Sequence, residues 1–123
     1  KKTEFSYPWI NLEQCAAEEN VMLLPGSLFR KMADEVYAKA EAEPNIVYQI
    51  SGTRTGLACV AYNHGVMITL DHMIFNNVFA EQILPLSIGE KPMYTDLDLV
   101  YMKDTVLTKE IETLKNIMTE AIQ

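Results

Sequence analysis

A continuous apolar run that leads directly into a helical pattern is the feature that most constrains this chain. Residues 20–25 (NVMLLP) are closed by proline and glycine, as is typical of a strand covered on both faces. Over residues 27–43 the apolar side chains, from Leu28 onward, recur on one helical face. Ser27 stands at the N-cap position and Pro44 at the end. The two segments predict a buried strand, a tight turn and an amphipathic helix.

The same alternation continues along the chain. Residues 45–50 (NIVYQI) are rich in β-formers and predict a second strand, and residues 65–70 (GVMITL) predict a third. Helical patterns predict further helices over residues 12–18 with Asn11 as the N-cap, 54–63, 71–80, and from Thr105 or Thr108 to the C-terminus. Further strands are predicted over residues 83–88, where Pro85 suits an edge, and over residues 95–103.

Strands that alternate with helices predict right-handed crossovers and a mostly parallel sheet with helices on both faces. We therefore expect an α/β fold with three layers, α/β/α. The chain has 123 residues, the length of one domain, and 49% of them are apolar, which is enough to form a packed core.

The charge and the cysteines exclude several classes of protein. Ten basic and seventeen acidic residues give a net charge of −7, so the chain has no overall attraction to nucleic acid or to anionic membranes. No apolar run approaches the ~20 residues of a membrane span. The spacing does not follow a zinc-binding pattern at Cys15, Cys59, His64 and His72. We therefore expect no metal and no cofactor. We also expect a cytoplasmic location. Because the first residue is Lys1 and not methionine, we expect a piece of a longer protein.

Three short segments follow the strands predicted at residues 20–25, 45–50 and 65–70. Ligands bind outside the carboxyl ends of the strands in sheets of this kind. The segments carry groups that suit a carboxylate or phosphate, namely N–H groups at helix starts, hydroxyls, glycines and one guanidinium. The candidate ligand-binding residues are Gly26, Ser27, Ser51, Gly52, Thr53, Arg54, Thr55, Thr69, Asp71 and His72.

Each segment also has a plainer interpretation. Ser27 occupies the position of an N-cap, which is the commonest role of serine there, and Arg54 is equally compatible with a solvated side chain. Asp71 is another N-cap candidate. Asp71 and His72 together suggest acid–base catalysis, but adjacent residues at a helix start point apart. No serine or cysteine nucleophile is placed by the sequence to complete a triad.

Three stretches, taken in order, resemble one known family. Residues 20–30 (NVMLLPGSLFR) match an apolar strand, a small or polar turn and a helix, and residues 45–70 match a strand, a hydroxyl-bearing loop, a helix, a glycine and a strand. Residues 83–122 match a Leu-Pro-Leu strand, a Leu-Val-Tyr strand followed by Lys-Asp, and an amphipathic terminal helix. In this order they resemble the C-terminal part of the effector-binding domain of LysR-type bacterial transcriptional regulators.

The chain departs from the family pattern around the third predicted strand. The family usually has Gly-x-Gly ahead of that strand, where this chain has Asn63 and His64 before Gly65. It usually has proline after the strand, where this chain has Leu70 and Asp71. The departure concerns the backbone of the turn that carries the third candidate segment.

The resemblance implies a periplasmic-binding-protein-like fold of type II, in which two subdomains close on a small and often anionic effector. It assigns residues 1–94 to the second subdomain and residues 95–123 to a closing strand and helix that return to the first. The effector loops of the family's second subdomain match the three candidate segments. DNA is bound in the family by an N-terminal winged helix-turn-helix, which lies outside this chain, as does most of the first subdomain.

Three classes of function follow. The leading one is a non-enzymatic effector sensor. The alternatives are a small enzyme that uses Asp71, His72 and Arg54, and an extracytoplasmic solute-binding receptor, which an upstream signal peptide would favour.

Residues 95–123 would lack most of their native sheet here, so we expect a homo-oligomer, as a dimer or a swapped arrangement.

Overall fold

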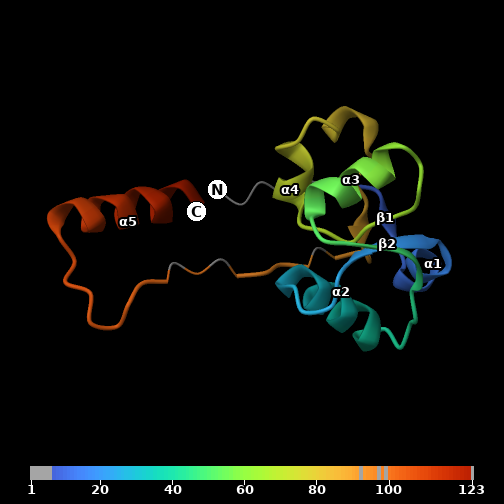
Figure 1. The fold of residues 1–123 in the computed structure, drawn as a ribbon, viewed down its shortest axis with the longest axis horizontal. Coiled ribbons are helices and arrows are strands. Elements are labelled where there is room, and N and C mark those ends of the chain that lie inside the picture. The colour runs from blue at the N-terminus through green and yellow to red at the C-terminus, as the bar shows by residue number, and fades with distance from the viewer. Residues whose placement is uncertain (1–6, 92, 97, 99, 123) are drawn as a thin grey trace. The chain divides into compact units, whose positions relative to one another are not determined.

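The computed structural model of the chain describes residues 7–91, 93–96, 98 and 100–122. The chain divides into two compact units (Figure 1). The larger unit spans Tyr7–Pro92 and holds all the strands found among the described residues. The smaller unit contains the chain from Met93 onward, including helix α5.

Strand β2 (Glu19–Leu23) is the centre of the larger unit. It pairs in parallel with β3 (Asn45–Ile50), and a parallel bridge joins Asn20 to Val66 on its other edge. The strands predicted over residues 20–25 and 45–50 are therefore confirmed, although β2 begins one residue earlier and ends two residues sooner. Parallel strands joined through helices make this an α/β fold, as expected.

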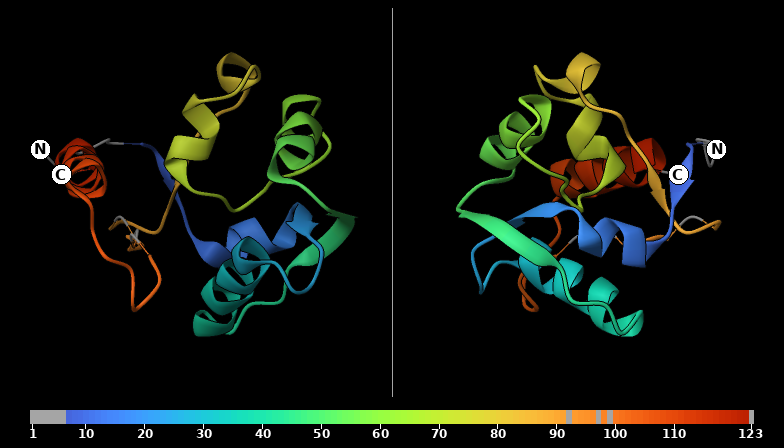
Figure 2. Two further views of the ribbon diagram at one scale, coloured as in Figure 1. Left: turned by 60° about the vertical axis from the view of Figure 1, so that its left-hand side comes forward. Right: turned by 90° about the vertical axis from the view of Figure 1, so that its right-hand side faces the viewer.

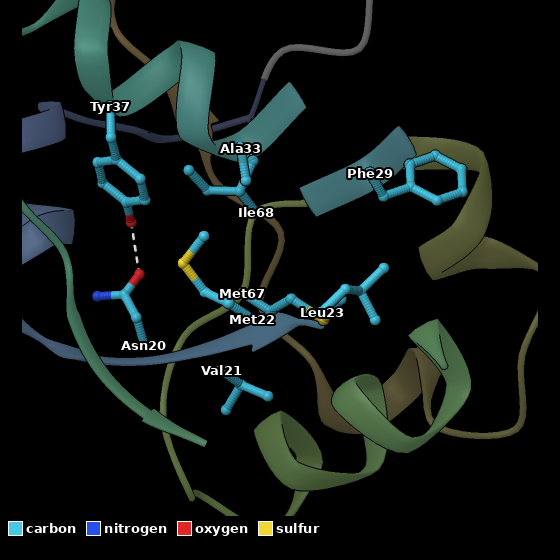
Figure 3. A pocket seen from close by; sticks show the side chains of 9 residues that line it. All are labelled: Asn20, Val21, Met22, Leu23, Phe29, Ala33, Tyr37, Met67 and Ile68. Atoms are coloured by element: carbon cyan, nitrogen blue, oxygen red, sulfur yellow. Dashed lines mark hydrogen bonds between the residues drawn. The ribbon is translucent and has the colours of Figure 1, made fainter. Parts of the chain in front are cut away.

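Helices α2 (Leu28–Lys39) and α3 (Thr53–Ala61) lie on opposite faces of β2 (Figure 2). Because both faces are covered, β2 is buried from its second residue to its last. Met22 belongs to the main core cluster with Ala33 and Tyr37 of α2. Val21 points to the opposite side of the strand (Figure 3).

The prediction of a third strand over residues 65–70 is wrong in extent, because only Val66 of that stretch forms a ladder bridge. The Val66 N–H donates to the carbonyl of Glu19 (2.8 Å), and the Val66 carbonyl accepts from the N–H of Val21 (2.9 Å). Gly65, with φ +131°, permits this approach, since a Cβ there would lie 2.5 Å from the Glu19 oxygen. Val66 still packs against the core, so the apolar run indicates burial and not ladder pairing.

The helix predicted over residues 27–43 is confirmed at its start but not at its end. Helix α2 stops at Lys39, because Glu41 adopts a left-handed conformation (φ 52°) that turns the chain out of the helix. Pro44 therefore does not end it. Leu28 was expected on the buried face and is 76% exposed, because it is the first helical residue and precedes the turns that contact the core.

Helix α1 (Leu12–Ala17) has the expected side-chain cap, whereas α3 has none. Helix α1 begins after Asn11, whose Oδ1 accepts from the backbone N–H of Gln14 (2.9 Å). Helix α3 begins one residue before the predicted start, after Gly52, which provides no side-chain cap. Both helices end within two residues of their predicted ends.

Helix α4 (Asp71–Phe75) is half the length predicted for residues 71–80. The side-chain amide of Asn77 donates to two carbonyls of α4, at 2.9 and 3.1 Å. These bonds satisfy carbonyls that a longer helix would pair with backbone N–H groups, so the helix ends there. A short 3-10 helix, η1 (Ala80–Gln82), follows.

The strand predicted over residues 83–88 is confirmed only in β4 (Ser87–Ile88). It pairs in parallel with β1 (Trp9–Ile10), a strand for which the sequence analysis made no prediction. Pro85 has no N–H to donate, and the ladder begins only after it. The larger unit thus contains two separate pairs of parallel strands among its described residues.

The smaller unit contains α5 (Lys109–Ile122). Of the two predicted caps, Thr108 is the one whose Oγ1 accepts from the N–H of Ile111 (3.4 Å). The strand predicted over residues 95–103 is wrong for the described residues of that stretch, which have no ladder partner; residues 97 and 99 lie outside the described part. The apolar face of α5 is partly exposed, by 39–58% at Ile111, Leu114, Ile117 and Met118.

The buried amide of Asn20 joins three elements of the larger unit. Its Nδ2 donates to the carbonyls of Cys15 (3.0 Å) and Glu18 (2.8 Å), where α1 ends. Its Oδ1 accepts from the hydroxyl of Tyr37 in α2 (Figure 3), which also contacts the Cys15 sulfur at 3.3 Å. One side chain of β2 therefore holds both α1 and α2.

The acidic groups of this network are held neutral. Burial raises the pKa of the Cys15 thiol; the hydrogen bond with Tyr37 opposes that shift, and the carboxylate of Glu18 adds to it. Burial also raises the pKa of the Tyr37 hydroxyl, as do its hydrogen bond to Cys15 and the charge the thiol would carry. The network is therefore built from uncharged groups.

We predict that Asn20→Ala destabilises the chain by about 3 kcal/mol, because it leaves a tyrosine hydroxyl and two backbone carbonyls without their partner. The measurement is the free energy of unfolding in urea. Asn45→Ala, at an exposed position of β3, is the matched control and should change stability by under about 0.5 kcal/mol. Equal effects of the two substitutions would contradict the role given to Asn20.

We predict that stability falls as the pH rises above 9, the ordinary pKa of a thiol. In that range the unfolded state releases the Cys15 proton while the folded state keeps it, so the free energy of unfolding decreases. Urea midpoints at pH 8 and pH 10 measure the fall. Cys15→Ala should show a smaller fall than the unsubstituted chain, whereas Cys59→Ala should keep it; equal falls in both variants would contradict the prediction.

Candidate functional site

The carboxyl ends of β2 and β3 meet at one edge of the larger unit. Leu23 and Ile50, the last residues of the two strands, are paired, and the N–H of Leu24 donates to the carbonyl of Ile50 (2.8 Å). The first loop (residues 25–27) and the second loop (residues 51–55) therefore begin side by side. The third loop (residues 69–72) follows Val66, on the other edge of β2.

The first loop is a tight turn into α2. Gly26 has φ +98° and open space where a Cβ would be, so the backbone conformation requires glycine but the surroundings do not. The Oγ of Ser27 accepts from the backbone N–H of Arg30 (3.1 Å). The N-cap interpretation of Ser27 is therefore confirmed, and its hydroxyl proton is still available to a ligand.

The second loop leads into α3 without a side-chain cap. Gly52 is the N-cap residue and has no side chain, so the N–H groups in the first turn of α3 receive no side-chain acceptor from their cap. Ser51, Arg54 and Thr55 are exposed, and Thr53 is half-buried. The Arg54 side chain makes no hydrogen bond or ion pair with any residue that the structure describes, as in the solvated interpretation.

The third loop does not have the geometry of a catalytic pair. Asp71 is the first residue of α4 and not its N-cap, which is Leu70. Its Oδ1 accepts from the backbone N–H of His72 (2.6 Å) and lies 4.0 Å from the His72 Nδ1, too far for a hydrogen bond. Both side chains are 58% exposed, whereas Thr69 is half-buried.

Arg30 is a residue at this edge that the sequence analysis missed. Its Nη1 donates to the carbonyl of Leu23 (2.7 Å) and to the Oε1 of Gln49 (2.9 Å), and its Nε donates to Asp34 (2.9 Å). Only 12% of the side chain is exposed. The spacing of Arg30 and Asp34, four residues apart on a helix, signals their ion pair, but the other two bonds arise from tertiary structure.

Residues 6–123 match the family model described as the LysR substrate binding domain. The chain belongs to this family. The resemblance stated from the sequence is therefore confirmed over nearly the whole chain. No curated protein and no solved structure matches the chain significantly.

LysR substrate-binding domains are the ligand-binding, regulatory parts of transcriptional regulators and not catalytic modules. None of the helices in the described residues is both long and apolar enough to cross a membrane. The same residues contain no group of three histidine, cysteine, aspartate or glutamate side chains that would hold a metal ion.

Two hollows in this LysR substrate-binding domain are lined by residues outside the three loops. The first, between β2 and α2 (Figure 3), has a volume of about 10 Å³, which is no more than one water molecule. The second has a volume of about 360 Å³ and lies at the end of α2, where Asp34, Glu41 and Glu43 would repel an anion. Neither suits a small anionic effector.

We predict that Ser27→Ala lowers the free energy of unfolding by about 1 kcal/mol, because the N–H of Arg30 loses the acceptor that begins α2. Urea unfolding followed by circular dichroism measures the loss. Ser51→Ala is the matched control, since Ser51 is exposed and caps no helix. A loss at Ser51 as large as that at Ser27 would show that the cap is not the cause.

Proposed function

We propose that this chain is the effector-sensing part of a LysR-type regulator and that it binds a small anion at its three loops. The observation that carries the proposal is the pairing of β2 with β3, which starts the first two loops side by side. Each of these loops leads into a helix of at least nine residues. The proposed effector-binding residues are Gly26, Ser27, Ser51, Gly52, Thr53, Arg54, Thr55, Thr69, Asp71 and His72.

The chemistry of these loops favours a carboxylate or phosphate. The first turn of α3 offers backbone N–H groups without a side-chain acceptor, and Arg54 has a guanidinium with no partner among the described residues. The hydroxyls of Ser27, Ser51 and Thr53 add donors. Asp71 would accept from a hydroxyl or amino group at the other end of the effector.

The remaining organisation is also proposed by analogy with the family. Residues 1–94 form the second subdomain of a three-layer, periplasmic-binding-protein-like fold, and residues 95–123 close onto the first subdomain. DNA is contacted by a separate N-terminal domain of the full regulator, which works in the cytoplasm as a homo-oligomer. The partly exposed apolar face of α5 supports a further packing partner, either the first subdomain or another copy.

Binding alone does not switch a regulator. An effector shifts the arrangement of the two subdomains only if it binds one arrangement more tightly than the other. The three loops supply contacts from one side of the cleft. We infer that the first subdomain supplies contacts from the other side, so the closed arrangement is the one that the effector favours.

We predict that small carboxylates bind and that their neutral analogues do not. Benzoate with benzamide, and succinate with succinamide, are titrated into the protein and followed by calorimetry. Arg54→Met should weaken carboxylate binding about tenfold, because a charge-assisted hydrogen bond is lost. Lys31→Met, at an exposed position of α2, is the matched control. Equal binding of amide and carboxylate, or no effect of Arg54→Met, would contradict the anionic site.

A further inference from the structure

Arg30 lies in the first turn of α2, but its side chain reaches back over the edge where β2 and β3 end. Its Nη1 bonds to the last carbonyl of β2, at Leu23, and to the side chain of Gln49 in β3. Its Nε bonds to Asp34, one turn further along α2. A single guanidinium therefore connects β2, α2 and β3, three of the four elements that flank the first two loops.

These bonds close the first loop on both sides. Leu24 joins the end of β2 to the loop, and the carbonyl of Leu23 accepts from the Arg30 side chain (2.7 Å). The loop enters α2 at Ser27, whose Oγ accepts from the backbone N–H of Arg30 (3.1 Å). The bond to Gln49 (2.9 Å) joins the same guanidinium to β3. Gln49 is the second-last residue of β3, and only Ile50 separates it from the second loop. Arg30 therefore bonds to the chain on both sides of the first loop and to the strand that precedes the second.

We propose that Arg30 is a positioning residue that holds the first and second loops at the spacing an anionic effector requires. The inference rests on the proposed function of these loops. Arg30 is not itself an effector ligand, because its charge is compensated by Asp34 at 2.9 Å and its side chain is largely buried. It acts through the backbone of the first loop.

The role requires the shape of arginine and not only its charge. The planar guanidinium presents donors in fixed directions and reaches Leu23, Gln49 and Asp34 together. A lysine has a single ammonium on a flexible stem, so it can keep an ion pair with Asp34 without bridging the two strands. Arg30→Lys therefore separates the positioning role from the ion pair.

The test compares Arg30→Met, Arg30→Lys and Gln49→Met with the control Lys31→Met, whose side chain is exposed on the same helix. Inorganic phosphate is the probe, and the amide signals of Ser27 and Thr53 are followed by NMR as it is added. Hydrogen exchange of the N–H of Leu24, which bonds to Ile50, is measured without phosphate. Val21, whose N–H bonds to Val66, is the reference within the same strand.

We expect Arg30→Met to weaken phosphate binding about tenfold, since the loops must be ordered before they bind. Arg30→Lys should recover thermal stability but not affinity. Gln49→Met removes one bond only and should weaken binding by about threefold. In all three variants the Leu24 N–H should exchange faster relative to Val21, whereas Lys31→Met should change neither property.

Each contrary result has a separate meaning. If the protein binds phosphate and Arg30→Met and Gln49→Met bind it equally well, the positioning role is wrong and the site stands. If phosphate moves no loop signal in the unsubstituted protein, the anion site itself is wrong. Hydrogen exchange still tests the role of Arg30 in that case. If the Leu24 N–H exchanges at an unchanged rate in Gln49→Met and Arg30→Lys, Arg30 does not position the first loop.

Discussion

The side-chain amide of Asn20 is the interaction on which the rest of the larger unit depends. A polar group that is 1% exposed is costly to bury unless each of its hydrogen-bonding atoms has a partner. Here the partners come from α1 and α2, so the amide can be satisfied only when both helices are in place. Because side chains alternate along a strand, a shift of β2 by one residue would turn the amide to the opposite face.

This placement extends to the edge that carries the loops. Once β2 has its register, the parallel ladder sets β3 beside it, and the two strands end at paired residues. Arg30 then finds acceptors on both strands within 2.9 Å. The core network and the loop edge lie at opposite ends of one short strand, so the geometry of the site follows from the packing of the core.

Local patterns in the sequence were enough to predict the elements whose causes are local. The caps at Asn11 and Ser27 and the buried strand β2 depend on neighbouring side chains or on apolar spacing. The strand-end rule selected three segments, and the ladder brings at least two of them together. Membership of the family also followed from the order of motifs.

The predictions that were wrong concern features with distant causes. Whether residues 65–70 form a strand depends on bonds to β2, and apolar content alone cannot distinguish packing from pairing. Helix α4 is short because the Asn77 amide bonds its carbonyls, and α2 stops early because Glu41 accepts a left-handed backbone. Arg30 was missed because two of its three acceptors, Leu23 and Gln49, are brought to it by folding.

The pairing of β1 with β4 has a consequence for the order of folding. Trp9 and Ser87 are neighbours in that ladder, although nearly all of the larger unit lies between them in sequence. Contacts between distant segments carry the largest loop-closure entropy and form slowly, whereas β2 and β3 are joined by a single helix. During synthesis β1 therefore leaves the ribosome unpaired, and it can pair with β4 only after almost the whole larger unit has been synthesised.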